Sequence, residues 1–200
     1  MTYTGAVTKA FHPKNGWNYI KNHNEVGYWE EDNILFIVPK GSDGIGWENG
    51  WLTDDWSSNL KFPKKKYGKY RTHRGFDEDY KEIQEDIMAI CLTGHGQGLK
   101  VVFIGFSRGG GMCYRMIEDW FYRTGLVAEA YLFGSPRIWG WKGCKRLKKI
   151  FSKTTNYQVC LVAHLPPVLF GFRHYGKIVK LKPKYHFWQI IKNHMSYKEF

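Results

Sequence analysis

The sequence has little of what marks a disulfide-rich, metal-binding or membrane-spanning protein. Its 200 residues include only four cysteines, with no Cys-x-x-Cys pair: Cys91, Cys113, Cys144 and Cys160. Cysteines scattered in this way argue against a zinc site and a dense disulfide framework, so we expect reduced thiols, no metal and no cofactor. The longest apolar runs are far shorter than the ~20 residues of a membrane span, so we expect no transmembrane segment.

A secretory leader is also not evident. The sequence opens on Met1-Thr2-Tyr3-Thr4-Gly5, without a basic stretch followed by an apolar one. We therefore expect a soluble or cytoplasmic protein, and peripheral association with a membrane stays open.

Acidic residues are nearly missing from the last third of the chain. Residues 130–200 contain 14 Lys and Arg but one acid, Glu199, for a net charge of +13, whereas residues 1–129 sum to −1. A basic surface attracts anionic partners such as lipid headgroups or nucleic acid, or is simply a solvated face. Nucleic-acid binding through residues 61–74 or 142–153 is disfavoured, because no recognition motif accompanies these basic stretches.

Short apolar runs alternate with helical patterns along the chain. We expect strands at residues 34–38, 101–104, 127–133, 157–162 and 178–181, and helices at about 76–91 and 112–123. This alternation predicts an α/β fold in one compact domain over residues 1–200, with a mostly parallel central sheet and helices on both faces. Residues 45–75 show no clear period, and such long loops are usually lids, binding loops or disordered segments.

One motif carries chemistry. Gly105-Phe106-Ser107-Arg108-Gly109 follows the apolar run 101–104 and precedes a helical stretch. This strand–turn–helix context is that of a nucleophile elbow, in which a serine sits on a sharp turn and the next helix points its amides at a developing oxyanion. A phosphate-binding loop is disfavoured, since neither Gly-Lys-Ser/Thr nor G-x-G-x-x-G is present. A serine needs a base, and four histidines follow Ser107: His164, His174, His186 and His194.

At this point the sequence resembles the class 3 lipases, the group that includes the fungal triacylglycerol lipases, with the α/β-hydrolase fold. The matching blocks span about residues 34–197, in the order of that family. They are Lys40-Gly41-Ser42, Asp55-Trp56 with Asn59-Leu60, His73-Arg74-Gly75-Phe76, Gly105 to Gly110, Phe133-Gly134-Ser135-Pro136-Arg137, Leu165-Pro166-Pro167, Gly171-Phe172-Arg173-His174-Tyr175-Gly176 and Asn193-His194-Met195-Ser196-Tyr197.

The resemblance implies roles. Ser107 would be the nucleophile and His174 the general base, and the amides of Ser42 and Arg108 would form the oxyanion hole. The loop at about 44–67 stands where the family carries its lid. His194 is interpreted as a residue that packs near the end of the chain.

One departure concerns the acid of the triad. The family places an aspartate shortly before its Leu-Pro-Pro, and here that position is Cys160, with no Asp or Glu anywhere from Ala130 to Lys198. Several arrangements stay open. A backbone carbonyl, Asn156 or a water could orient His174, an acid could come from residues 1–129, or a Cys160 thiolate could serve, although a free thiol is mostly neutral at pH 7.

The expected function is therefore that of a serine carboxylester hydrolase, lipase-like, phospholipase-like or esterase-like. It would act on lipid or other acyl esters through an acyl-enzyme at Ser107. The alternative is a catalytically weak lipase-like binding protein that uses its basic C-terminal half to hold an anionic partner. The missing acid favours this alternative, and the intact Ser107, His174 and Gly41-Ser42 favour the enzyme.

Overall fold

The structure is a computed structural model that describes residues 1–22, 24–42, 64–67, 70–140, 144–186 and 190–200. Within these residues, one sheet has the strand order β1-β2-β3-β6-β7-β9-β11. The strands are β1 (Tyr19–Lys21), β2 (Asn24–Glu31), β3 (Ile34–Pro39), β6 (Lys100–Phe106), β7 (Glu129–Phe133), β9 (Thr154–Gln158) and β11 (Lys177–Lys180). The β1–β2 and β2–β3 pairs are antiparallel, and every pair from β3 to β11 is parallel.

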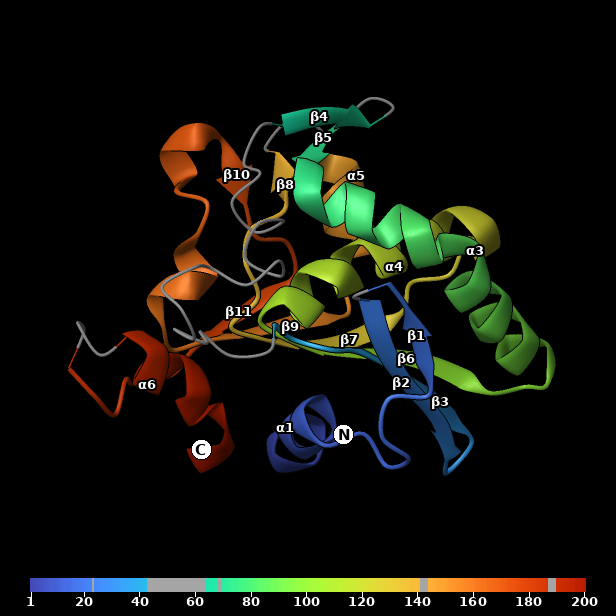
Figure 1. Ribbon diagram of the computed structural model, residues 1–200. Coiled ribbons are helices and arrows are strands. Elements are labelled where there is room, and N and C mark those ends of the chain that lie inside the picture. Colours follow the sequence, from blue (N-terminus) through green and yellow to red (C-terminus); the bar gives the residue numbers. More distant parts are fainter. Residues whose placement is uncertain (23, 43–63, 68–69, 141–143, 187–189) are drawn as a thin grey trace.

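Helices cover both faces of this sheet (Figure 1). On one face lie α3 (Arg74–Gly96) and α4 (Arg108–Thr124). On the other face lies α1 (Tyr3–Phe11), close to the C-terminal turn η4 (Ser196–Glu199). The remaining helical segments are α5 (Cys144–Ile150), η2 (Leu161–His164), η3 (Val168–Phe170) and α6 (Ile190–Met195).

Two apolar cores follow from the alternation of side chains along the strands, since successive residues point to opposite faces. Leu35, Ile37, Val101 and Phe103 pack with the apolar stripe of α3 and α4. Their neighbours Phe36, Val38, Val102 and Ile104 pack instead with α1 and Tyr197. The central strands are therefore buried on both faces, which is why they read as unbroken apolar runs in the sequence.

The predicted α/β architecture is confirmed, and most predicted elements are present. The predicted strand at 157–162 is wrong in extent, because β9 ends at Gln158 and residues 161–164 form the turn η2. The sequence also did not predict α1, β1, β2 or a small antiparallel sheet in the order β10-β8-β5-β4. Its strands are β4 (Lys64–Tyr67), β5 (Tyr70–His73), β8 (Trp139–Gly140) and β10 (Phe172–Arg173). Most of the predicted lid, residues 44–63, lies outside the described residues, and its end forms β4.

Glycines allow α4 to approach the sheet closely. A Cβ at position 109 would lie 2.2 Å from the Pro39 carbonyl oxygen, and one at position 105 would lie 2.6 Å from the backbone of Gly109 and Gly110. Both contacts are with backbone atoms, which do not move aside as a flexible side chain does. Glycine at these positions therefore sets the distance between β6, α4 and the end of β3.

We expect Gly109→Ala to destabilise the fold by about 1–3 kcal/mol, the usual range for overpacking a well-packed interior. Denaturant unfolding measures the change. Gly96→Ala is the matched control, because a Cβ there meets nothing within 4 Å and alanine is favoured in helices. Equal stability of the two variants would contradict the close approach of α4 to β3.

Candidate active site

Ser107 stands between β6 and α4 in a strained backbone conformation. Its φ is 52° and its ψ is −122°, a left-handed φ that non-glycine residues rarely adopt. Two backbone hydrogen bonds hold it there: the Ser107 amide donates to Phe133 O at 2.8 Å, and Ser107 O accepts from the Gly110 amide at 3.0 Å. The side chain is thus placed at the N-terminus of α4, where free amides and the helix dipole favour negative charge.

The end of β3 lies against this elbow. A Cβ at Gly41 would be 3.2 Å from the Phe106 carbonyl oxygen, so the chain of residues 39–41 passes directly over the turn. Ser42 follows immediately and is partly buried. The two predicted oxyanion residues, Ser42 and Arg108, therefore belong to segments that lie at the same turn as Ser107.

His194 on α6 packs on the elbow from the other side of the sheet. Its ring stacks on Phe106 with a centroid distance of 4.7 Å, and its Cε1 is 2.8 Å from where a Gly134 Cβ would lie. Phe106 precedes Ser107, and Gly134 follows the residue whose carbonyl holds the Ser107 amide. The sequence interpretation gave His194 only a packing role, although it stands in the Asn193–Tyr197 block.

The two ring nitrogens of His194 differ. Nδ1 lies 3.0 Å from Cys160 Sγ, whereas Nε2 is buried and has no hydrogen-bond partner among the described residues. Burial lowers the pKa of His194 to about 4, because a charged imidazolium loses its hydration there. At neutral pH the ring is therefore uncharged, so one of its nitrogens is a hydrogen-bond acceptor.

Cys160 is the N-cap of η2 and is 5% exposed. Burial raises the pKa of its thiol, and the neighbouring amides of Ala163 and Val162 oppose that shift. Tyr197 Oη is 3.8 Å from Sγ and itself accepts from the Val159 amide at 2.9 Å. The sulfur consequently sits among several donors, in a spot that would suit an anion, yet it carries a neutral thiol.

His174 occupies a different environment. Its Nε2 is 2.6 Å from Ala163 O and its Nδ1 is 3.4 Å from Tyr114 Oη. Tyr114 Oη also contacts Asn156 Oδ1 at 2.6 Å, so the ring belongs to a polar network between α4 and β9. Burial lowers the pKa of His174 to about 4, although its bond to Ala163 O opposes that shift.

The predicted residues thus fall into two groups. Arg108 follows Ser107 in the elbow, and Ser42 follows the Gly41 that packs on it. Cys160 meets His194 rather than the predicted base His174. No hydrogen bond joins Ser107 to either histidine in the described part of the chain. What distinguishes the histidines is their neighbours: His194 packs on Phe106 and leaves Nε2 unpaired, whereas polar groups contact both nitrogens of His174.

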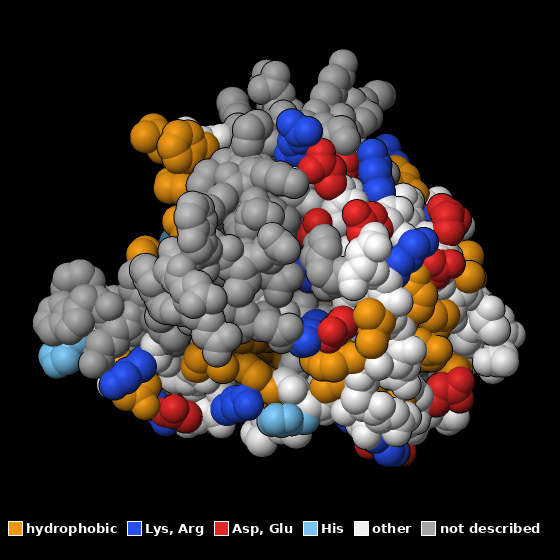
Figure 2. Space-filling model, in the orientation of Figure 1, with side chains coloured by type: hydrophobic (Ala, Val, Ile, Leu, Met, Phe, Trp, Pro, Cys, Tyr) orange, Lys and Arg blue, Asp and Glu red, His pale blue; other side chains and the backbone are white. Residues whose placement is uncertain are grey.

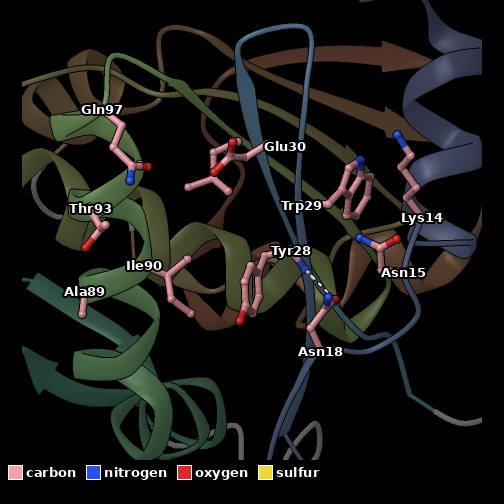
Figure 3. Close-up of a pocket in the computed structure, with 12 residues that line it drawn as sticks. Lys14, Asn15, Asn18, Tyr28, Trp29, Glu30, Ala89, Ile90, Thr93 and Gln97 are labelled. Atoms are coloured by element: carbon pink, nitrogen blue, oxygen red, sulfur yellow. Dashed lines mark hydrogen bonds between the residues drawn. The ribbon is translucent and has the colours of Figure 1, made fainter.

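A separate cleft of about 650 Å³ lies between β2 and the C-terminal half of α3 (Figure 3). Tyr28, Trp29, Ile90 and Thr93 are among the residues that line it. None of the predicted site residues borders this cleft, so it is distinct from the elbow.

None of the described helices is long and apolar enough to cross a membrane.

Comparisons with known proteins point to lipases. No family model matches the sequence. A lipase from Rhizomucor miehei is 27% identical over 161 residues, which are 76% of this chain and 43% of that protein. The chain therefore spans about half the length of the relatives it matches.

Solved structures agree with this similarity. The Rhizomucor miehei lipase in complex with its propeptide has a TM-score of 0.66 at 26% identity, over 82% of this chain and 55% of that one. A triacylglycerol lipase whose catalytic centre is formed by a serine protease triad matches with the same score and identity, over 82% and 64% of the two chains. Lipase II from Rhizopus niveus shares the fold, with a TM-score of 0.69 at 19% identity over 90% and 78%.

The chain is thus a homologue of the Rhizomucor miehei lipase and has the α/β-hydrolase fold of the fungal class 3 lipases.

Proposed function

We propose that this protein hydrolyses carboxylic esters of lipids through an acyl-enzyme at Ser107, with His194 as the general base in place of His174. The observation that carries the proposal is the strained Ser107 at the start of α4, preceded by Phe106, on which a buried histidine ring with one unpaired nitrogen is stacked. Strain of this kind persists where the surrounding structure holds it, and it is concentrated at active sites.

The reaction has two steps. Ser107 Oγ attacks the ester carbonyl carbon while His194 Nε2 takes its proton, and the carbonyl electron pair moves to oxygen. When the pair returns, the bond to the alcohol breaks and the alkoxide takes the proton from His194. A water molecule then attacks the acyl-enzyme in the same way and releases the acid and free Ser107.

The amides of Ser42 and Arg108 would stabilise the negative oxygen. Their segments meet at the elbow, and the Arg108 amide belongs to the first turn of α4. Preorganised amides of this kind are worth about 10²–10³ in kcat each.

Cys160 would hold the imidazole in place of a carboxylate. For Nε2 to accept the serine proton, Nδ1 must carry a hydrogen and donate it to Sγ. A neutral thiol is a weak acceptor and does not stabilise the imidazolium that forms in the transition state. We therefore propose slow catalysis. The same thiol favours the second candidate, a lipase-like protein that binds its ligand without efficient turnover.

The choice of base is tested by replacing each histidine. Hydrolysis of p-nitrophenyl esters of several chain lengths should fall in His194→Gln to the level of Ser107→Ala, because no other group takes the serine proton. His174→Gln should retain turnover within a few fold. The reverse order would make His174 the base. If no ester is hydrolysed in a manner that depends on Ser107, and a fluorophosphonate probe leaves Ser107 unlabelled, the binding protein is the correct reading.

The role of Cys160 is tested by Cys160→Asp. A carboxylate there would receive the amides of Val162 and Ala163, fix the hydrogen on Nδ1 and stabilise the imidazolium, so kcat should rise at least about tenfold; loss of such an acid costs about 10⁴ in a protease. The negative charge would also raise the pKa of His194 above about 4. Because only neutral His194 accepts a proton, the acid limb of the pH–rate profile should move to higher pH.

Cys160→Asn is the matched control, since it has similar size and no charge. We expect this variant neither to raise kcat nor to move the acid limb of the pH–rate profile. A folded Cys160→Asp variant with unchanged kcat and an unchanged pH profile would show that Cys160 does not orient the base.

The substrate surface is proposed from an exposed apolar turn. Leu169 is 91% exposed and Phe170 57%, both in η3, and Leu161 in η2 is 51% exposed. Figure 2 shows hydrophobic side chains projecting at the upper left, where η3 lies in Figure 1. Arg173 donates to Val168 O at 3.1 Å, and Arg137 donates to Pro166 O at 3.1 Å. Apolar side chains with a basic surround fit an anionic lipid surface.

We expect Leu169→Ser to weaken binding to vesicles of phosphatidylcholine and phosphatidylglycerol about tenfold, since a buried Leu side chain contributes about 1.5–3 kcal/mol. Vesicle flotation measures this. Ile20→Ser on β1 is the control, because Ile20 is also exposed, at 63%, but belongs to another part of the surface. An equal loss of vesicle binding in both variants would show that η3 does not contact the vesicle surface.

A further inference from the structure

The side chain of Arg108 is buried and tied to two other elements. It is 2% exposed, and its Nη2 lies 3.0 Å from Asp79 Oδ2 on α3. The same nitrogen donates to Asn24 Oδ1 at the start of β2. Arg108 therefore joins the elbow to a helix and to a strand that are distant from it in the sequence.

Asn24 connects the partners of Arg108 to each other. Its Nδ2 donates to the Asp79 carbonyl oxygen at 3.3 Å and to Glu82 Oε2 at 3.0 Å. The guanidinium is thus held by groups that are themselves fixed, and Asn24 is 1% exposed. A network of this kind sets direction as well as distance, because each hydrogen bond has a preferred angle.

Glu25, the residue after Asn24 in β2, contacts the segment that follows β3 and leads to Ser42. The Lys40 amide donates to Glu25 O at 2.9 Å, and Lys40 Nζ lies 2.6 Å from Glu25 Oε2. Lys40 is two residues before Ser42. Asn24 and Glu25 consequently contact both segments that carry the proposed oxyanion amides, one through Arg108 and the other through Lys40.

A buried charged side chain costs more free energy than a buried apolar side chain of similar size. Taking an ion pair out of water costs free energy that apolar side chains of similar size avoid, so packing alone does not account for an arginine here. We propose that Asp79 and Asn24 are positioning residues that act through the Arg108 side chain to fix its backbone amide for the oxyanion. This inference rests on the proposed ester hydrolysis at Ser107.

The same pair of helices offers a matched control. Arg115 on α4 forms ion pairs with Glu118 and, at 3.2 Å, with Asp77 on α3, and all three side chains are 0% exposed. Their loss should lower stability without reaching the elbow. Glu118→Gln therefore reports what a broken buried ion pair does by itself.

The experiment compares Asp79→Asn, Asn24→Ala and Glu118→Gln with the wild-type chain. Steady-state hydrolysis of a p-nitrophenyl ester gives kcat and KM, the rate of fluorophosphonate labelling reports Ser107 directly, and thermal unfolding gives stability. We expect Asp79→Asn and Asn24→Ala to lower kcat and the labelling rate at least tenfold with KM within twofold, because the loss occurs in the transition state. Glu118→Gln should keep both rates within twofold while its melting temperature falls.

Asn24→Ala still tests the inference if Asp79→Asn does not fold, because it removes the neutral partner of Arg108 and leaves the Arg108–Asp79 ion pair in place. If Asp79→Asn and Asn24→Ala hydrolyse the ester and react with the probe as fast as Glu118→Gln, the inference is wrong. The proposed function still stands in that case, provided that the wild-type chain hydrolyses the ester. A wild-type chain that neither hydrolyses esters nor reacts with the probe would overturn the proposed function, and this inference with it.

Discussion

The approach of helix α4 to the end of strand β3 is the constraint on which the site depends. Gly109 passes so close to the Pro39 carbonyl that a single methyl group would separate them. The first turn of α4 and the segment that leads to Ser42 thus lie against the same elbow, in which Ser107 has a left-handed φ. The strain is sustained because β6 and β3 are buried on both faces and do not yield.

The chemistry of the site depends on how little water reaches it. His194 is 8% exposed and Cys160 is 5% exposed, so both favour their neutral forms. A carboxylate beside the imidazole would stabilise a cation in such surroundings, whereas a thiol only orients the ring. The elbow and its amides therefore fit the proposed acyl transfer, and we expect the neutral thiol beside the proposed base to limit its rate.

Local patterns predicted the elements whose signal is contained in one segment. The apolar runs of β3, β6 and β7 and the stripe of α3 follow from burial, which leaves a period in the sequence. The elbow was also found, because its glycines and serine are contiguous. The β4–β5–β8–β10 sheet was missed, since β8 and β10 have only two residues each and are defined by pairing with distant strands.

The choice between His174 and His194 lay beyond such patterns. Each histidine stands in a block with aromatic neighbours, and nothing in either block states which one reaches the elbow. The sequence by itself determined the α/β architecture, the serine turn and the lack of any Asp or Glu from residue 130 to residue 198. Only the tertiary structure paired Cys160 with His194 and Arg108 with Asp79, because those contacts join residues distant in the chain, and side-chain packing alone decides which of them meet.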